Sequence, residues 1–530
     1  MMMRKISLIL ILISSGWAQV ELFREGDVID ARFYGEVLAT NVYVTSHIPD
    51  LTAAAASSEN EMFQAGYARL NSRIRVNDIF TIGLGLTWWG LWSGFSKKNF
   101  PFVSEAFVMT DTLNWPFGTR AVIAGGRMVR NYGLGLLFSD FYGQGYNTFA
   151  LVLRPNQEQE VYIDFIYTKI SEGGGNQEDW FYFPVAINTA TTKRYIWIYT
   201  KYDLENYGIV LRKLKRNDQP YAFNIYFLTL AEDRAISPGF NPFWTGLYID
   251  VGPFRKFALR GEIGYMFGRW DAVKPIYNDF PDKLYTIIRN CDVNSNQDCP
   301  GFRFNSLAFT IDAKYIASET FGMGISYTSF QGDDGRTSDV YEGWFPPSMR
   351  GELSLNSNWS KWSGLGEIFT WGMKPGLYRD IFGSVMSDLR IINVYLEAVP
   401  YTIFHSLKAR FDFFGYWEYW GPEKEYISVD TIKYPIKPDQ AYALDLGYEF
   451  DLSLRFRYAE VADLGVIIGY FIPGNRLKYG WIRPTSLAAL QKVGLLTGDI
   501  ITNGTQIVNY SKADAGSFLA RFWIYREINF

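Results

Sequence analysis

The sequence predicts a single antiparallel β-barrel of eighteen or twenty strands that spans an outer membrane. The first indication is the segment 441–459, in which apolar side chains alternate with polar and mostly charged ones throughout. Period-two alternation places successive side chains on opposite faces of a strand. A long strand with one apolar, aromatic face and one ionic face is typical of a wall between lipid and a wet lumen. The two ends of the chain give the second and third indications.

The N-terminus has the pattern of an export signal. A positive region at Arg4 and Lys5 precedes a short apolar core, and Ala18 supplies the small residue before a cleavage site. We therefore expect residues 1–18 to be a signal peptide and residues 19–530 to be the barrel. The apolar core is too short to cross a bilayer, and the residue after the expected cleavage site is Gln instead of the Cys of a lipoprotein anchor.

The C-terminal segment SFLARFWIYREINF also alternates. Phe518, Phe522 and Phe530 share one parity, and Arg521 and Glu527 share the other. A terminal Phe that closes an alternating strand resembles the C-terminal signal of bacterial outer-membrane barrels. The resemblance implies that the barrel-assembly machinery recognises Phe530.

Composition favours one large sheet that meets lipid. A chain of 530 residues would ordinarily suggest several domains, but no linker or low-complexity tract divides this one. Aromatic residues make up 18% of the chain, and membrane barrels use Trp and Tyr in girdles at the lipid–water interface. The net charge of −4 does not indicate a nucleic-acid partner.

Strand-like runs recur along the chain between turn residues such as Asn77-Asp78 and Pro155-Asn156. Most have about the ~10 residues that a tilted strand needs to cross a bilayer. Both chain ends should be periplasmic, which requires an even number of strands. The runs number nineteen, so either one run between residues 171 and 243 is not a wall strand or Trp180–Ile187 is an additional one. The predicted runs are Val28–Val44, Met62–Val76, Ile79–Trp89, Ser104–Leu113, Thr119–Val129, Gly145–Arg154, Glu160–Ile170, Arg194–Asp203, Asn206–Arg216, Tyr221–Leu230, Trp244–Val251, Lys256–Gly268, Phe302–Ile316, Phe321–Phe330, Leu389–Val399, Phe404–Tyr419, Ala441–Ala459, Leu464–Ile472 and Gly516–Asn529.

Long connections should be extracellular and short turns periplasmic. The connection 331–388, rich in Trp and Gly, is long enough to fold into the barrel mouth and constrict it. The connection 473–515 contains a helix-like patch that ends at Gly494, a residue suited to a C-cap, and this patch is either a lid or a surface ornament. The expected extracellular connections are 46–60, 90–102, 130–143, 171–193, 269–301, 331–388, 420–438 and 473–515.

Charged residues lie on the parity opposite the apolar ones, which predicts a charged lumen. Arg69, Arg73 and Arg75 alternate with Leu70 and Ile74, and an arginine on the lipid face at mid-bilayer would cost about 2–4 kcal/mol. These residues either form rings of charge that select a polar or anionic solute or form salt bridges that satisfy a polar interior. The same parity argument places inward Arg260, Glu262, Asp312, Lys314, Lys408, Arg410, Asp412, Asp445, Glu449, Asp451, Arg455 and Arg457.

Two blocks of the sequence resemble the outer-membrane alginate-export porin family. The first block, within 119–154, contains Gly126-Arg127, a glycine-bearing loop and a following strand. The second block contains the strand with Gly447, Glu449 and Asp451, its hairpin partner and the exit at Pro473-Gly474. The resemblance implies an eighteen-stranded barrel that exports or admits a charged polysaccharide or another solute through an arginine-lined pore. By position it implies that Arg127, Arg455 and Arg457 are pore residues.

The segment CDVNSNQDC contains both cysteines of the chain, Cys291 and Cys299, and in an exported protein this spacing predicts a local loop disulfide. The loop also offers oxygen ligands at the alternating spacing of calcium loops. Gln297 stands where such loops usually have Gly, so a disulfide loop without metal is the simpler interpretation. The candidate calcium ligands are Asp292, Asn294, Asn296 and Asp298.

These patterns predict a passive outer-membrane channel for small or oligomeric polar or charged solutes, with polysaccharide export as one form of it. A closed structural or adhesive barrel is an alternative. An interfacial lipid hydrolase is another, because His405 precedes Ser406 at the start of a predicted strand. No further catalytic motif accompanies this pair, so an aromatic-belt histidine is the simpler interpretation and we do not expect an enzyme.

Overall fold

The computed structural model describes twenty-two segments of the chain, which include every strand of the barrel wall. Among these residues there is no helix long and apolar enough to span a membrane. The described residues are 29–45, 61–76, 79–91, 102–138, 145–156, 158, 160–171, 181–189, 192–200, 204–216, 218–232, 240–273, 299–332, 339–347, 366, 388–399, 407–420, 426–429, 432–435, 443–458, 462–476 and 516–529.

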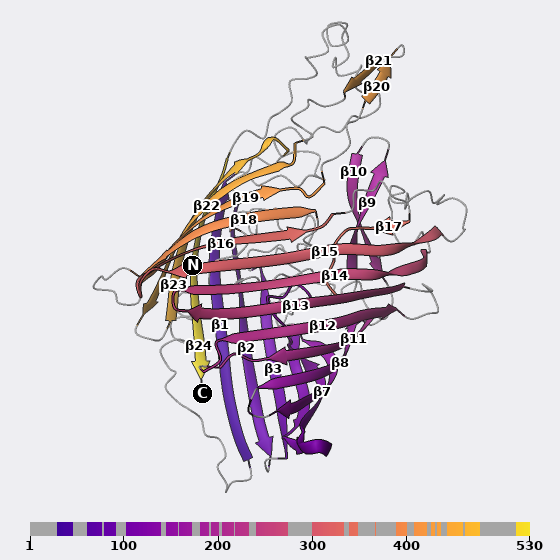
Figure 1. The fold of residues 1–530 in the computed structure, drawn as a ribbon. Coiled ribbons are helices and arrows are strands. Elements are labelled where there is room, and N and C mark those ends of the chain that lie inside the picture. The colour runs from indigo at the N-terminus through magenta and orange to yellow at the C-terminus, as the bar shows by residue number, and fades with distance from the viewer. Residues whose placement is uncertain are drawn as a thin grey trace.

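The strands form one closed antiparallel barrel, in which each wall strand pairs with its neighbours in sequence and β1 also pairs with β24 (Figure 1). The main sheet joins twenty strands, but β5 (Leu113–Asn114) and β17 (Val340–Tyr341) are two-residue pieces, which leaves eighteen in the wall. These are β1 (Ile29–Thr45), β2 (Glu61–Val76), β3 (Phe80–Leu91), β4 (Phe102–Thr110), β6 (Arg120–Met128), β7 (Tyr146–Asn156), β8 (Val161–Ser171), β11 (Leu204–Lys213), β12 (Tyr221–Glu232), β13 (Phe240–Phe254), β14 (Phe257–Val273), β15 (Cys299–Ile316), β16 (Phe321–Phe330), β18 (Leu389–Ala398), β19 (Lys408–Trp417), β22 (Asp445–Tyr458), β23 (Ala462–Pro473) and β24 (Ser517–Asn529).

One of the nineteen predicted runs, Arg194–Asp203, is not part of the wall. β9 (Phe181–Thr189) and β10 (Thr192–Thr200) pair only with each other, and β8 pairs directly with β11. The predictions of eighteen strands and of one barrel are confirmed, and the alternative of twenty is wrong. Alternation identifies a strand but carries no information about its partner, which is why a hairpin within a connection resembles a wall strand. A second small hairpin joins β20 (Tyr426–Val429) and β21 (Ile432–Pro435).

The connections differ in length between the two ends of the barrel. Tight turns such as that between β13 and β14 lie at the end where β1 begins and β24 finishes, and the long connections lie at the other end. In bacterial barrels the long connections are extracellular. The connection 233–239 between β12 and β13 also joins strand ends on this side of the barrel. It is absent from the predicted set because the predicted number of strands was unresolved between residues 171 and 243.

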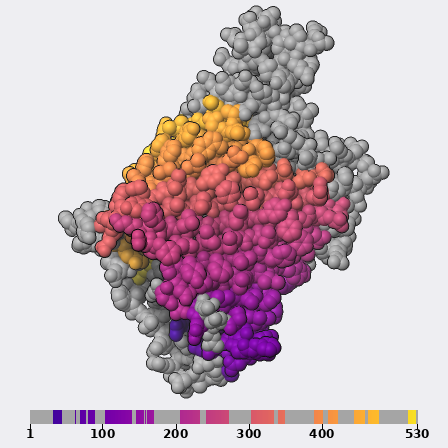
Figure 2. Space-filling view, viewed as in Figure 1, coloured from indigo at the N-terminus to yellow at the C-terminus, as the bar shows by residue number. Residues whose placement is uncertain are grey.

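The outer face of the wall is apolar. Leu70, Leu84, Ile263 and Leu454 are 49%, 50%, 43% and 39% exposed, although each lies in the middle of a strand. Figure 2 shows the outer surface from β12 in magenta to β19 in orange as a continuous layer of side chains. Exposed apolar side chains on a closed sheet without free edges are the arrangement that a lipid bilayer requires.

Candidate pore lining and constriction

The predicted arginine ladder of β2 faces the inside of the barrel, on the side opposite the exposed Leu70. Each arginine reaches a carboxylate outside its own strand. Arg73 lies 3.0 Å from Glu105 of β4, and its guanidinium lies 4.7 Å from the ring centroid of Phe107. The stacking fixes one face of the guanidinium while the edge pairs with the carboxylate. The other two pairs are Arg69 with Glu36 at 2.8 Å and Arg75 with Asp111 at 2.6 Å.

The turn residue Asp111 belongs to this ladder although it lies outside the strands. The hydrogen bond from Arg75 lowers the pKa of Asp111, so this carboxylate stays ionised at the short-turn end of the barrel. It therefore completes a row of ion pairs that descends the inner face of β2.

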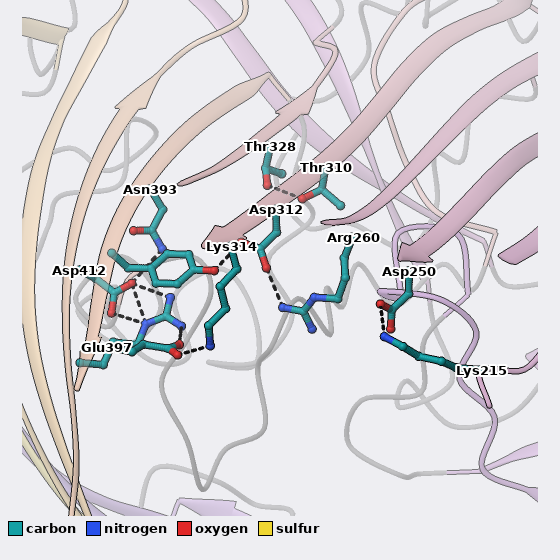
Figure 3. A network of polar contacts seen from close by, with 12 residues as sticks. Lys215, Asp250, Arg260, Thr310, Asp312, Lys314, Thr328, Asn393, Glu397 and Asp412 are labelled. Carbon is teal, nitrogen blue, oxygen red and sulfur yellow. Dashed lines mark hydrogen bonds and ion pairs between the residues drawn. The ribbon is translucent and has the colours of Figure 1, made fainter. Parts of the chain in front are cut away.

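A second network crosses the inner face from β14 to β19 (Figure 3). Arg260 lies 2.7 Å from Asp312, which also accepts a 2.8 Å hydrogen bond from Tyr395. Arg410 lies 2.7 Å from Asp412 and 3.0 Å from Glu397, and Lys314 also pairs with Glu397. The network connects the four strands β14, β15, β18 and β19 through charge-assisted hydrogen bonds, so five of the predicted residues form one continuous group. These are Arg260, Asp312, Lys314, Arg410 and Asp412.

The arginines of the third predicted group, on β22, form ion pairs with a carboxylate that was not among the predicted residues. Arg455 and Arg457 both pair with Asp463 of β23, the latter at 3.3 Å. Glu449 is fully buried and accepts a 2.9 Å hydrogen bond from Tyr416. The register brings Lys408 opposite Arg455 and brings Asp412 opposite Asp451.

Two predicted residues have other positions. Arg127 is paired in register with Asn147, which shares the outward parity of the exposed Phe149, so it lies on the lipid-facing side of β6. Its expected position in the pore rests on the resemblance and not on parity. Asp445, at the long-connection end of β22, accepts a 2.8 Å hydrogen bond from the backbone N–H of Asn475 and anchors the chain after β23.

The two partners of an inward ion pair usually lie at different depths, with the carboxylate nearer the wall and the cation nearer the lumen. In most of them the cationic side chain is more exposed than its carboxylate: Arg73 is 28% exposed and Glu105 8%, and Arg260 is 35% exposed and Asp312 11%. The carboxylates therefore lie against the wall and the guanidinium groups extend toward water. The pairs Arg69–Glu36 and Arg154–Glu160 depart from this rule because both partners are about evenly exposed, and Arg410–Asp412 departs because it is wholly buried. In Arg410–Glu397 the order is reversed, since the carboxylate is 25% exposed and the guanidinium 5%. The same order holds for Arg212–Asp164, Lys215–Asp250, Lys314–Glu397, Arg455–Asp463 and Arg457–Asp463.

The connection after β6 folds into the barrel. Leu136, Leu137 and Phe138 are almost completely buried. The buried carboxylate of Glu262, on the inner face of β14, accepts hydrogen bonds from the backbone N–H groups of Leu134 at 2.7 Å and Leu136 at 3.2 Å. The sequence predicts this connection only as an extracellular loop. The apolar run that ends at Phe138 was the signal, because an exposed loop would not carry it.

A polar chain joins this infolded segment to the wall. Arg130 donates a 2.9 Å hydrogen bond to the hydroxyl of Tyr132, which donates a 3.0 Å bond to Asp164. Arg212 pairs with the same carboxylate at 2.8 Å. Burial raises the pKa of Tyr132 to about 12, so its hydroxyl remains protonated and keeps donating to Asp164. Asp164 and Arg212 were not among the predicted site residues.

Part of the connection 331–388 also folds inward, as predicted for that loop. Tyr341, Trp344 and Phe345 are buried, and the indole N–H of Trp244 on β13 donates a 3.0 Å hydrogen bond to the backbone carbonyl of Phe345. This segment and the one after β6 meet at Gly264, where an added Cβ atom would lie 2.6 Å from Trp344 and 3.1 Å from Leu137. The absence of a side chain at Gly264 makes room for both.

Several predictions fall on residues outside the described part of the chain. These are the signal peptide, His405, the terminal Phe530 and the loop 291–298 with its candidate calcium ligands. Cys299 is the first residue of β15, and its disulfide with Cys291 stays a prediction.

The closed antiparallel wall, apolar outside and charged inside, with tight turns at one end and long connections at the other, defines a transmembrane β-barrel of the bacterial outer-membrane class. No protein-family model matches the chain, and no curated protein matches its sequence.

The solved structures to which the chain is similar include proteins of two bacteria. OccAB1 of Acinetobacter baumannii is 10% identical with a TM-score of 0.47, covering 95% of this chain and 98% of that one. OccK11 (OpdR) of Pseudomonas aeruginosa is 9% identical with a TM-score of 0.46, covering 94% and 96%. OprD of the same organism is 9% identical with a TM-score of 0.44, covering 97% of each chain. At these values, the function has to be inferred from the residues of this chain.

Proposed function

We propose that the protein is a passive channel of the outer membrane for polar solutes and that it prefers anions. The observation that carries this proposal is the depth sorting of the inward ion pairs. A solute in the lumen meets the guanidinium groups of residues such as Arg73 and Arg260 before it meets the carboxylates behind them. Rings of such groups select for negative charge.

The buried carboxylates are compatible with this preference. They hold the arginines in fixed directions, and a guanidinium that already pairs with one carboxylate still has other N–H donors for a second. Arginine matches the two oxygens of a carboxylate better than lysine does. The preferred solutes are therefore small or oligomeric molecules with carboxylate groups, and polysaccharide export is the form of this function that the two resembling sequence blocks support.

The test is the reversal potential of the channel in planar bilayers under a salt gradient. Replacing Arg69, Arg73 and Arg75 together by Ala should move the reversal potential toward cation preference, because the β2 ladder loses its exposed positive charge. Leu70→Ala, on the lipid face of the same strand, is the matched control and should change nothing. The proposal is wrong if the triple variant, still folded, keeps the selectivity of the native protein.

A second variant, which neutralises the carboxylate that pairs with Arg73, tests whether the two charges lie at different depths. Glu105→Gln should shift the reversal potential less than Arg73→Ala does, because Glu105 is 8% exposed and Arg73 28%. Equal and opposite shifts would mean that both charges face the lumen alike, which contradicts the depth sorting.

One observation favours a closed structural or adhesive barrel, namely the two buried infolded segments 130–138 and 339–347. Planar-bilayer conductance separates the two functions. A channel should conduct, and a variant without residues 331–388 should conduct more. A barrel that passes no current even after this deletion is a closed one. The alternative of an interfacial hydrolase, which we do not expect, is tested by a lipid-hydrolysis assay of His405→Ala.

A further inference from the structure

The strands β13, β14 and β15 carry two aromatic rows on their outer face that mark the edges of the bilayer. Near the tight-turn end, Phe257 and Tyr315 are register partners with ring centroids 4.9 Å apart. Near the other end, Phe267 stacks on Phe243 of β13 with centroids 5.6 Å apart. From Phe257 to Phe267 a tilted strand rises roughly 25 Å, the height of the apolar band of outer-membrane barrels.

A row of polar side chains lies one alternation beyond the upper aromatic row. Arg269 of β14 is the register partner of both Asn241 of β13 and Arg303 of β15. The side chains of Arg269 and Arg303 are each 69% exposed. The row therefore stands on the lipid-facing surface at the level of the headgroups of the extracellular leaflet.

Two arginines directly opposite each other on one face of a sheet repel, so their juxtaposition requires compensation. Arg269 pairs with Asp271 at 2.7 Å and Arg303 pairs with Asp339 at 2.8 Å. Asp271 lies farther from the apolar band than Arg269 on the same strand, so its carboxylate approaches from the loop side. Each pair uses part of a five-donor guanidinium, and further N–H groups remain to bind an anion at the membrane surface.

We propose that Asn241, Arg269 and Arg303 form a binding site for the phosphate group of a phosphorylated glycolipid in the extracellular leaflet. The two guanidinium groups supply charge-assisted hydrogen bonds to phosphate oxygens, and the amide of Asn241 supplies a neutral donor. The aromatic row of Phe243 and Phe267 lies directly below, where it contacts the first carbons of the acyl chains. The site is on the outer surface and does not depend on the channel function.

The experiment titrates the purified full-length barrel, in phosphatidylcholine nanodiscs, with diphosphoryl lipid A and counts bound lipid by native mass spectrometry. Removing each arginine should weaken binding about fivefold, because a basic residue near an anionic membrane surface contributes about 1 kcal/mol. The variant R269A/R303A should therefore bind about 25-fold more weakly than the native protein. The variant R216A, whose Arg216–Asp218 pair lies in a tight turn at the opposite end, is the matched control and should bind normally.

Further arms identify what is bound and guard against misfolding. Dephosphorylated lipid A should bind the native barrel as weakly as R269A/R303A binds the diphosphorylated form. The variant R269K/R303K keeps both charges and should bind with intermediate affinity, and unchanged heat-modifiable migration in electrophoresis should show that each variant is folded. Equal binding by the native protein and R269A/R303A overturns the proposal. Arginine-dependent binding of inorganic phosphate without preference for the lipid would assign the site to a soluble anion and overturn it as well.

Discussion

Adjacent residues in one wall strand of this protein face solvents of opposite kinds. Leu70 is exposed on the outer face, and its neighbour Arg69 pairs with Glu36 on the inner face. Because side chains alternate strictly along a strand, a slip of one residue would exchange every lumen-facing and lipid-facing group. The sequence is therefore compatible with only one register of each wall strand, because every residue must face the correct solvent.

Substitution of Leu70 by Arg tests this arrangement. The charged side chain would enter the hydrocarbon, which should destabilise the folded barrel by about 2–4 kcal/mol. Equilibrium unfolding in lipid vesicles measures the loss. Arg69→Lys, one residue away, keeps a charge on the inner face and should cost far less. If Leu70→Arg were as harmless as Arg69→Lys, the assignment of the two faces of β2 would be wrong.

The carboxylate of Glu262 makes a second test at this scale. In Glu262→Ala the backbone N–H groups of Leu134 and Leu136 would lose their acceptor, and each unsatisfied buried donor costs about 1–3 kcal/mol. The segment 130–138 should then leave its place, and single-channel recordings should show larger or more variable conductance. Glu262→Gln keeps one acceptor oxygen and should show a smaller effect. Identical recordings for all three proteins would mean that Glu262 does not hold this segment.

Parity within a strand predicted the inward direction of Arg73, Arg260 and Arg410 from sequence alone. It could not name their partners, because pairing across strands depends on a register that no local pattern contains. Asp463 was therefore missed as the shared partner of two arginines. For Arg127 the prediction came from the resemblance, which implied the pore. The register of its strand instead places Arg127 on the outer face.

At the scale of elements, the infolded segments depend on small residues in the wall. Gly264→Val should displace both segments, because its branched side chain would occupy the space of Trp344 and Leu137. We expect increased single-channel conductance and a changed tryptophan fluorescence spectrum, with the barrel intact. Gly261→Ala, three residues away on the outer parity of β14, is the control and should alter neither. Unchanged conductance in Gly264→Val would contradict the constriction.

The elements themselves were largely predictable, because alternation, turn residues and length together mark each crossing of the membrane. The wall strands agree with the predicted runs except for the run that became β10. Two features were not predictable. Alternation does not distinguish a strand of the wall from one in a hairpin of a connection, and the inward folding of 130–138 requires the cavity left by glycines on strands far away in sequence.

For the whole molecule, the closed sheet leads to a simple spectroscopic expectation. Circular dichroism of the purified protein should be dominated by β-structure, and the protein should fractionate with the outer membrane. Unheated samples should migrate differently from boiled samples in electrophoresis, because a closed barrel resists detergent. A spectrum dominated by helix, or recovery in the periplasmic fraction, would contradict the fold and its location.

The seam between β1 and β24 has a consequence for the order of events during biogenesis. Thr45 pairs with Phe518 and Tyr34 pairs with Asn529, so the first strand to be synthesised must wait for the last one before its second edge is covered. Until then the chain is an open sheet with two edges that can recruit any other extended strand. No truncated product is a smaller working version of this protein, and a cell that makes it must protect the whole translated chain until the seam closes.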